Sequence, residues 1–235
     1  MRNPSTRGVR ACFSGLADLV LPLRCAGCGA TGSRWCGECG PQLGALRRVR
    51  RPFLDPAPAV YALGYYRGPA RRAVLAYKES GQRGLATPFG ERLATGLAVL
   101  SKERPDLLAV GDHCCLVPAP SRASASRQRG GAHMVRVGER AVAALAAAGW
   151  SCSLADCLVL ARGARDSVGL TPAERTRNLA GRVRLRSGRL PSARSSLVLI
   201  DDVITTGATA TSCLRALETA ELRVTAVLGL TATSR

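Results

Sequence analysis

The stretch SSLVLIDDVITTGATATS, residues 195–212, joins an apolar run to two adjacent aspartates and then to threonines around a glycine. Residues 197–200 predict a buried strand, and the residues after the glycine predict a helix. In a parallel α/β sheet, ligands bind beyond the carboxyl ends of the strands. Asp201 and Asp202, called the acidic doublet below, follow the apolar run directly. We therefore expect them at that edge of a sheet, next to the loop over residues 205–209.

This loop, called the hydroxyl loop below, combines features that favour an anion. Backbone N–H groups at the start of a helix carry partial positive charge, and Gly207 allows close approach of a ligand. The hydroxyls of Thr205, Thr206 and Thr209 can donate to phosphate oxygens, while carboxylates can accept from sugar hydroxyls or hold Mg²⁺. The pattern predicts a phosphorylated sugar as ligand. In the simpler alternative, the aspartates cap the turn after the strand and the threonines are ordinary caps of the helix N-terminus.

Two other phosphate-binding motifs do not fit the hydroxyl loop. No lysine follows Gly207 in the way that a P-loop requires. The loop also lacks the G-x-G-x-x-G spacing of a dinucleotide site. The sequence thus gives no support to a P-loop nucleotide hydrolase and little to a dinucleotide-dependent enzyme.

The domain organisation follows from length and from the order of apolar segments. A chain of 235 residues, 46% of them hydrophobic, can form one α/β domain with a small appendage. From residue 60 onward, predicted strands alternate with predicted helices, which favours a mostly parallel sheet with helices on both faces. We expect an N-terminal helix and cysteine-rich segment over 1–46, a linker over 47–59 and the α/β domain over 60–235. Two polar stretches, 121–133 and 164–182, fit no regular element and are expected to be functional loops or disordered insertions.

The net charge of +18 permits binding to phosphate-rich partners such as nucleic acid. Of the 34 basic residues, only Lys78 and Lys102 are lysines. Arginine in place of lysine, together with many alanines, is also what a GC-rich genome produces without any functional demand. Charge therefore leaves single-stranded DNA as one open alternative, and anionic partners in general as another.

Four of the ten cysteines form two closely spaced pairs, Cys25-x2-Cys28 and Cys36-x2-Cys39. Four thiolates in two tight turns suit tetrahedral Zn²⁺ in a closed structural site. A redox-active dithiol is the alternative, which two adjacent copies make less favourable. The remaining cysteines are expected to be reduced, small buried residues: Cys12, Cys114, Cys115, Cys152, Cys157 and Cys213.

The first residues mimic a secretory signal, with basic residues followed by an apolar stretch. Asp18 interrupts that stretch, and Cys25 and Cys28 stand where a cleavage site would be expected. Apolar residues at helical spacing over 16–23 favour a short amphipathic helix instead. No apolar run reaches the roughly 18–20 residues that span a bilayer. We expect a cytoplasmic protein without a membrane span.

The segment VLIDDVITTGAT resembles the signature of the type I phosphoribosyltransferases. The resemblance implies that Asp201 and Asp202 meet the ribose hydroxyls of 5-phosphoribosyl 1-diphosphate (PRPP). It also implies that the hydroxyl loop, including Ala208, holds the 5-phosphate. The implied fold is the mostly parallel sheet of that family, and the implied cofactor is Mg²⁺ bound with PRPP.

Most of the chain resembles the ComF family, in which a short zinc-binding segment precedes a phosphoribosyltransferase-like domain. This family includes a competence (DNA-uptake) protein. The segments VLAYKESG (74–81) and LVPAPSR (116–122) are similar to the family's lysine helix and its V-P-V-P segment. RQRGGAHM (127–134) corresponds to its R-G-F-N-Q-A stretch. The residues that this resemblance implies in ligand binding are Lys78, Pro118, Ala119, Arg127 and Arg129.

The chain departs from the ComF pattern at several positions. Gly131, Ala132 and His133 replace the usual Phe-Asn-Gln, and residues 167–169 stand where a glutamine is expected. No recognisable motif pairs His113 or His133 with a nucleophile or a carboxylate, so we predict no catalytic role for them. The acceptor of the phosphoribosyl group stays open.

Two functions therefore compete. The first is an Mg²⁺-dependent transferase that acts on PRPP and releases pyrophosphate, with Asp201 and Asp202 as its central residues and Arg127, Arg129 and Lys78 as cations for the leaving group. The second is a non-catalytic accessory or ligand sensor in DNA uptake. This alternative would bind single-stranded DNA or a protein partner through its zinc segment and arginines.

Overall fold

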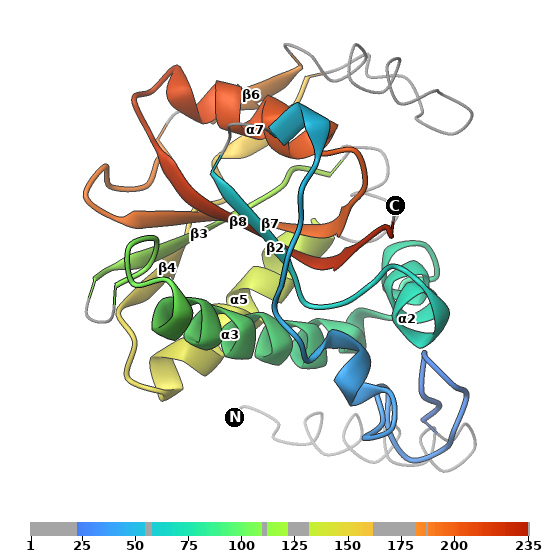
Figure 1. Cartoon of the computed structure of the whole chain (residues 1–235). Coiled ribbons are helices and arrows are strands. Elements are labelled where there is room, and N and C mark those ends of the chain that lie inside the picture. Colours follow the sequence, from blue (N-terminus) through green and yellow to red (C-terminus); the bar gives the residue numbers. More distant parts are fainter. Residues whose placement is uncertain are drawn as a thin grey trace, which may run out of the picture.

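The structure is a computed structural model, and its strands form one six-stranded sheet and one two-stranded sheet (Figure 1). It describes residues 23–54, 58–109, 112–121, 132–161, 182–186 and 188–234. The larger sheet has the order β1-β2-β8-β7-β3-β4, and the smaller one pairs β5 with β6. The predicted N-terminal helix and most of the stretches 121–133 and 164–182 lie outside the described residues.

The strands are β1 (Arg47–Arg48), β2 (Ala59–Ala62), β3 (Cys114–Pro118), β4 (Cys152–Leu154), β5 (Leu158–Leu160), β6 (Val183–Leu185), β7 (Ser196–Ile204) and β8 (Val224–Ala232). The α-helices are α2 (Gly68–Lys78), α3 (Ala86–Glu103), α5 (His133–Ala147) and α7 (Ala208–Glu218). Short 3₁₀ turns are η1 (Gly40–Leu43), η2 (Pro52–Leu54) and η3 (Arg83–Leu85).

The predicted mostly parallel α/β sheet is confirmed. Strand β7 pairs in parallel with β8 and β3, β2 pairs in parallel with β8, and β3 pairs in parallel with β4. Only the edge pair of β1 and β2 is antiparallel in this sheet. The parallel strands end at the same edge, so the residues after β7 and β3 lie side by side.

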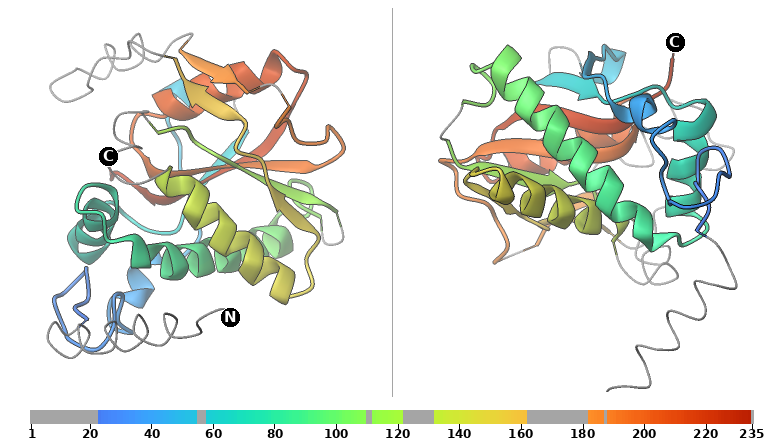
Figure 2. Two further views of the ribbon diagram at one scale, coloured as in Figure 1. Left: turned by 180° about the vertical axis from the view of Figure 1, so that it is seen from behind. Right: turned by 90° about the horizontal axis from the view of Figure 1, so that it is seen from below.

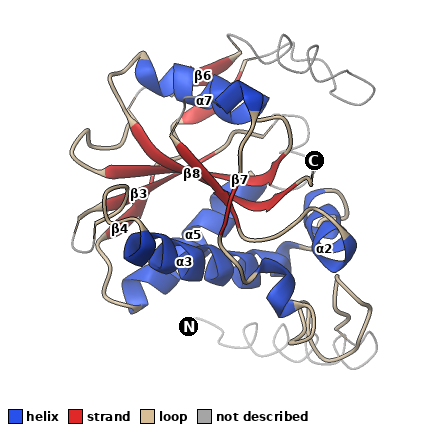
Figure 3. Ribbon diagram, in the orientation of Figure 1, coloured by secondary structure: helices blue, strands red, loops and turns tan. Residues whose placement is uncertain are grey.

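Helices cover both faces of the sheet, as expected for parallel strands (Figures 2 and 3). Helices α3 and α5 pack together on one face, whereas α7 and the β5–β6 pair lie on the other (Figure 1). Helix α2 stands beside the carboxyl edge of the sheet, near the C-terminus (Figure 1). Gly90 allows the close crossing of α3 and α5, because an added Cβ would lie 2.8 Å from the backbone nitrogen of Ala141.

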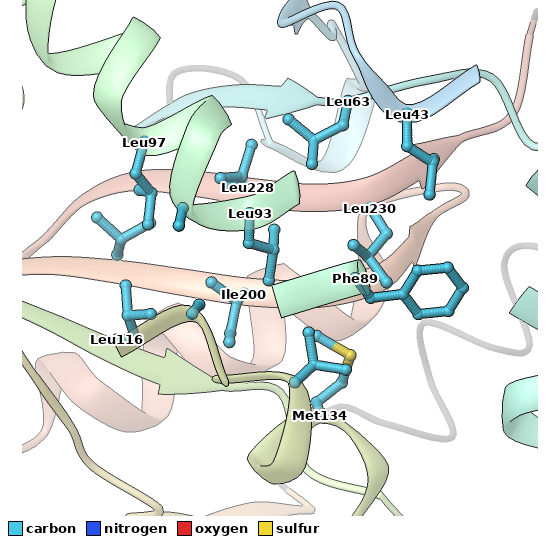
Figure 4. Close-up of a cluster of buried hydrophobic side chains, with 14 of the residues drawn as sticks. Leu43, Leu63, Phe89, Leu93, Leu97, Leu116, Met134, Ile200, Leu228 and Leu230 are labelled. Atoms are coloured by element: carbon cyan, nitrogen blue, oxygen red, sulfur yellow. The ribbon is translucent and has the colours of Figure 1, made fainter. Parts of the chain in front are cut away.

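The core forms one layer on each side of the sheet. Val198 and Ile200 of β7 point into the layer beneath α3 and α5, which Figure 4 shows around Phe89. Leu197 and Leu199 point into the opposite layer beneath α7. Successive residues of a strand face opposite sides, so a continuous apolar run is what a strand buried on both faces requires.

The elements differ from the sequence expectations at several places. Residues 47–54, part of the predicted linker 47–59, form β1 and η2, and Val49 donates its N–H to the carbonyl of Val60 at 2.8 Å. This segment crosses the sheet edge from the side of α3 to that of α7 (Figure 1). Strand β5 does not join the larger sheet but pairs antiparallel with β6. Short strands such as β4 carry too few residues for a periodic signal.

None of the described helices is long and apolar enough to cross a membrane.

Candidate functional site

The acidic doublet lies inside β7 and not after it, because the strand continues to Ile204. Alternation along the strand turns the two side chains to opposite faces of the sheet. Asp202 is buried, with 5% of its surface exposed, whereas Asp201 is half-buried. The two carboxylates therefore have different surroundings, which their adjacency in the sequence does not reveal.

Asp202 is enclosed by two cationic or proton-donating side chains from different helices. Lys78, the last residue of α2, places Nζ 2.9 Å from Oδ2 and 3.2 Å from Oδ1. His133, the first residue of α5, places Nε2 2.6 Å from the same Oδ2. The hydroxyl of Thr231 on β8 donates to the Asp202 backbone carbonyl at 3.0 Å. Asp202 thus joins α2, α5 and β8 at the carboxyl edge of the sheet.

These contacts shift the protonation of the carboxylate and of its partner. Burial acts to raise the pKa of Asp202, but the Lys78 charge and the hydrogen bond from His133 hold that pKa below its ordinary value. Burial also opposes the charge of Lys78, and the Asp202 carboxylate outweighs it, so the Lys78 pKa is raised. At neutral pH the pair is therefore fully ionised.

Asp201 has the opposite electrostatics. Its Oδ1 accepts the backbone N–H of Asp202 at 2.9 Å. Burial, followed by the adjacent negative charge of Asp202, raises the pKa of Asp201 above its ordinary value. A cation or a hydroxyl donor bound beside Asp201 would therefore favour the ionised form of this carboxyl.

The hydroxyl loop connects β7 to α7 as predicted. Gly207 has φ +89°, which L side chains rarely adopt, and it is the N-cap of α7. The Ala208 N–H donates to the Thr206 hydroxyl at 3.3 Å. Thr205, Thr206 and Thr209 are all half-buried. The loop therefore presents hydroxyls and a helix N-terminus at the same edge of the sheet as the doublet.

The segment before β2 holds this loop from outside, which the sequence did not predict. Arg51 donates from Nε to the carbonyl of Thr205 and from Nη2 to the carbonyl of Thr233. Leu54 packs so closely on Gly207 that an added Cβ would lie 2.6 Å from Leu54 Cδ1. The backbone of the loop is thereby fixed at its first residue and at its glycine.

The other predicted ligand residues divide into two groups. Pro118 ends β3 opposite Ile200 of β7, and Ala119 donates its N–H to the Ile200 carbonyl at 2.8 Å. Both are buried and adjoin the doublet at the carboxyl edge. Arg127 and Arg129 lie outside the described residues.

Sequence reasoning missed His133 as a member of this site. It lies 69 positions from Asp202 in the chain, so no local motif connects the two. The one sequence feature that could have indicated it is that His133 stands in the RGGAHM segment at a position where the ComF pattern has a different residue. His113, in contrast, is exposed and binds the hydroxyls of Ser151 and Ser153, both at 2.8 Å.

The predicted cysteine pairs come together in one cluster, called the cysteine knuckle below. The Sγ atoms of Cys25, Cys28, Cys36 and Cys39 all lie within 4.8 Å of one another. Four thiolates at about 2.3 Å from a tetrahedral ion would stand about 3.8 Å apart, so the cluster can hold a metal ion such as zinc.

The chemistry of the cysteine knuckle also suits a metal. The backbone N–H groups of Gly27 and Cys36 each donate to Cys25 Sγ at 3.4 Å. Burial acts to raise the pKa of Cys25, but these backbone hydrogen bonds lower it to about 6. A thiolate at neutral pH is the form that binds a metal.

A line of aromatic rings connects the cysteine knuckle to the doublet. Trp35 contacts Phe89 edge-on at 6.3 Å between ring centres, and Phe89 contacts Tyr77 at 5.5 Å. Tyr77 in turn contacts the His133 ring at 6.0 Å. Arg72 of α2 donates to the Gly27 carbonyl at 2.5 Å. The knuckle therefore packs on α2 and α3 and is not a separate appendage.

Of the other cysteines, four are buried as predicted: Cys114, Cys115, Cys157 and Cys213. Cys152 is only half-buried, and Cys12 lies outside the described residues.

The comparisons with known proteins give no further guide. The chain matches no protein-family model and no curated protein. A functional proposal therefore rests on the geometry of the doublet, the hydroxyl loop and the cysteine knuckle.

Replacing one cysteine tests the cysteine knuckle. Cys25→Ser removes the thiolate that two backbone N–H groups support, so we expect loss of bound zinc, measured by metal analysis of purified protein. Trp35 emission should shift to the red as the segment loosens. Cys152→Ser, which lies outside the cluster, is the matched control and should retain the metal. Equal zinc content in both variants would contradict the metal site.

The two aspartates should affect stability in opposite directions. The lowered pKa of Asp202 means that its contribution is present above pH 3.8, its ordinary value, and is lost as pH falls further. Asp202→Asn leaves buried partners unpaired and should lower the free energy of unfolding at neutral pH by about 3 kcal/mol.

Because the pKa of Asp201 is raised, its ionisation costs stability as pH rises above that ordinary value. Asp201→Asn should therefore be as stable as the native chain, or more so, at neutral pH. Urea denaturation of both variants between about pH 4 and about pH 8 measures these effects. Equal destabilisation by both substitutions would refute the assignment.

Proposed function

We propose that the protein is a phosphoribosyltransferase-like member of the ComF family that binds PRPP and transfers its phosphoribosyl group with release of pyrophosphate. One observation carries the proposal. A half-buried carboxylate, Asp201, and a threonine-rich loop at a helix N-terminus lie at the carboxyl edge of a parallel sheet. The carboxyl edge is where open α/β sheets bind ligands. Asp201 and this loop supply acceptors for sugar hydroxyls and donors for a phosphate.

Each part of the ligand has a partner in this arrangement. The 5-phosphate takes hydrogen bonds from the hydroxyl loop, whose backbone is held by Arg51 and Leu54. Asp201 accepts from the ribose hydroxyls. Pro118 and Ala119 border the sugar at the end of β3, on the side where a pyrophosphate would lie. The arginines at 127 and 129 are proposed as cations for that leaving group.

The metal ions have separate roles in this proposal. Zn²⁺ in the cysteine knuckle is structural, because the knuckle offers four protein ligands and no open position. Mg²⁺ fits the doublet only through Asp201, since both oxygens of Asp202 are engaged by Lys78 and His133. One carboxylate together with phosphate oxygens is a usual environment for Mg²⁺. When bound, Mg²⁺ would neutralise charge on the departing pyrophosphate.

The proposal rests on binding that calorimetric titration with PRPP and Mg²⁺ can measure. Asp201→Asn should weaken binding at least about tenfold, because hydrogen bonds to a charged group are lost. Affinity of the native chain should fall as pH is lowered from about 9 to about 5, because protonation of Asp201, whose pKa is raised, removes the acceptor. Glu218→Gln on the exposed end of α7 is the control.

Pyrophosphate release from PRPP with a panel of nucleobases and amines then identifies the acceptor. Absence of PRPP binding by the native chain would overturn the proposed function. Binding without release of pyrophosphate with any acceptor would favour the ligand-sensor alternative.

The alternative, an accessory protein in DNA uptake, is supported by a different surface. A cavity of about 450 Å³ along β1 is lined by Arg47, Arg48, Arg50 and Arg51, and none of the described residues that line it is acidic. Tyr65 at its edge is 39% exposed. The guanidinium groups of Arg47 and Arg67 lie 5.0 and 4.9 Å from the Tyr65 ring centre. Cations beside an exposed aromatic ring suit single-stranded nucleic acid.

Fluorescence anisotropy with a labelled oligothymidine tests this arginine groove. We expect binding that weakens steeply with salt, and a salt dependence that is shallower by about one phosphate contact in Arg47→Ala and in Arg48→Ala. Arg194 is an exposed arginine just before the amino end of β7, an inner strand, and it does not line the groove; Arg194→Ala should therefore bind like the native chain. Equal affinity for all these variants would remove support for a nucleic-acid role of the groove.

A further inference from the structure

His133 occupies an unusual position for one of only two histidines in the chain. It begins α5, it is 5% exposed, and its ring points at Asp202 with an Nε2–Oδ2 distance of 2.6 Å. Its other ring nitrogen, Nδ1, is buried without a hydrogen-bond partner among the described residues. The contact with Asp202 is therefore the polar interaction that fixes the orientation of this ring.

Helix α2 holds His133 in place. The Tyr77 hydroxyl donates to the His133 backbone carbonyl at 2.7 Å, and the Tyr77 ring meets the imidazole edge-on at an interplanar angle of 66°. The next residue, Lys78, reaches the same carboxylate from the same helix. Two consecutive residues of α2 thus set the histidine and the lysine around Asp202.

These contacts give the two aspartates of the doublet different hydrogen-bonding states. The protein itself supplies donors to both oxygens of Asp202, and this carboxylate is almost completely enclosed. Asp201 has an internal hydrogen bond from one backbone N–H and remains half-buried. A ligand at the carboxyl edge therefore meets one carboxylate that is already satisfied and one that can still accept.

We propose that His133 is a positioning residue: by donating from Nε2 to Asp202 it holds that carboxylate toward α2 and α5, and so leaves Asp201 to meet the sugar. The role in ligand binding rests on the proposed function, whereas the His133–Asp202 contact does not. This role requires a side chain at position 133 that can place an N–H donor within hydrogen-bond distance of Asp202. A glutamine amide can supply one, whereas alanine cannot.

Binding of PRPP with Mg²⁺, followed by calorimetry, tests the positioning role. His133→Ala should weaken binding about tenfold or more, because a hydrogen bond to a charged group is lost and Lys78 alone then holds Asp202. His133→Gln should stay within about threefold of the native chain, since its amide restores the donor. His113→Gln, at the exposed histidine before β3, is the matched control and should have no effect.

A merely structural histidine would give a different pattern. Equal affinity of His133→Ala and the native chain overturns the proposal, and so does a His133→Gln variant as weak as His133→Ala. Circular dichroism and thermal melting of each variant show whether it is folded. If His133→Ala does not fold, the folded His133→Gln variant and the spectroscopic measurement below decide.

Nuclear magnetic resonance of the ring nitrogens tests the contact without any ligand. The neutral His133 ring should carry its proton on Nε2, because the ionised Asp202 can only accept. Asp202→Asn should change the His133 nitrogen shifts and leave those of His113 unchanged. A proton on Nδ1, or His133 shifts unaltered in Asp202→Asn, would overturn the contact. If the native chain binds no PRPP, the proposed function fails, and this measurement still decides whether His133 anchors Asp202.

Discussion

Asp202 carries a charge inside the protein, and burying an ion costs several kcal/mol unless partners compensate for the lost water. The compensation comes from two residues that are distant in the chain, Lys78 at the end of α2 and His133 at the start of α5, while Thr231 on β8 donates to the Asp202 backbone carbonyl. Satisfying this one carboxylate therefore fixes where two helix ends meet the carboxyl edge of the sheet. The candidate ligand site is built around that fixed point.

The same constraint explains why two adjacent aspartates need not repel one another strongly. Strand alternation turns their side chains to opposite faces, and protonation separates them further, since the pKa of one is lowered and that of the other is raised. Asp202 is thus enclosed and hydrogen-bonded within the protein, whereas Asp201 is half-buried and can still accept a hydrogen bond. The phosphosugar and Mg²⁺ proposed above would favour the ionised form of Asp201, so their binding would offset the electrostatic cost of ionising this carboxyl.

Local patterns in the sequence were enough for the sheet and for much of the site. The apolar run before Asp201, the glycine of the hydroxyl loop and the two cysteine pairs each place chemistry within a few residues, and strand β7, the loop and the cysteine cluster are found there. Long-range contacts were beyond such reasoning. His133 meets Asp202 across 69 positions, and Arg51 reaches Thr205 across 154. The arginine-rich segment before β2 was predicted to be a linker because of its polar composition. Composition alone does not reveal that β1 in this segment pairs with β2.

Helix α2 contacts both the cysteine knuckle and the doublet, which suggests what the small cysteine-rich segment contributes to the protein. The knuckle has little core of its own, so its Trp35 packs on Phe89 of α3, and Arg72 of α2 bonds to its backbone. The same α2 ends in Tyr77 and Lys78, which orient His133 and Asp202. Ring contacts from Trp35 through Phe89 and Tyr77 to His133 are rigid and close-packed, so order in the knuckle favours order in α2. A metal ion bound by four cysteines would thus stabilise α2, the helix that carries Lys78 and contacts His133 through Tyr77.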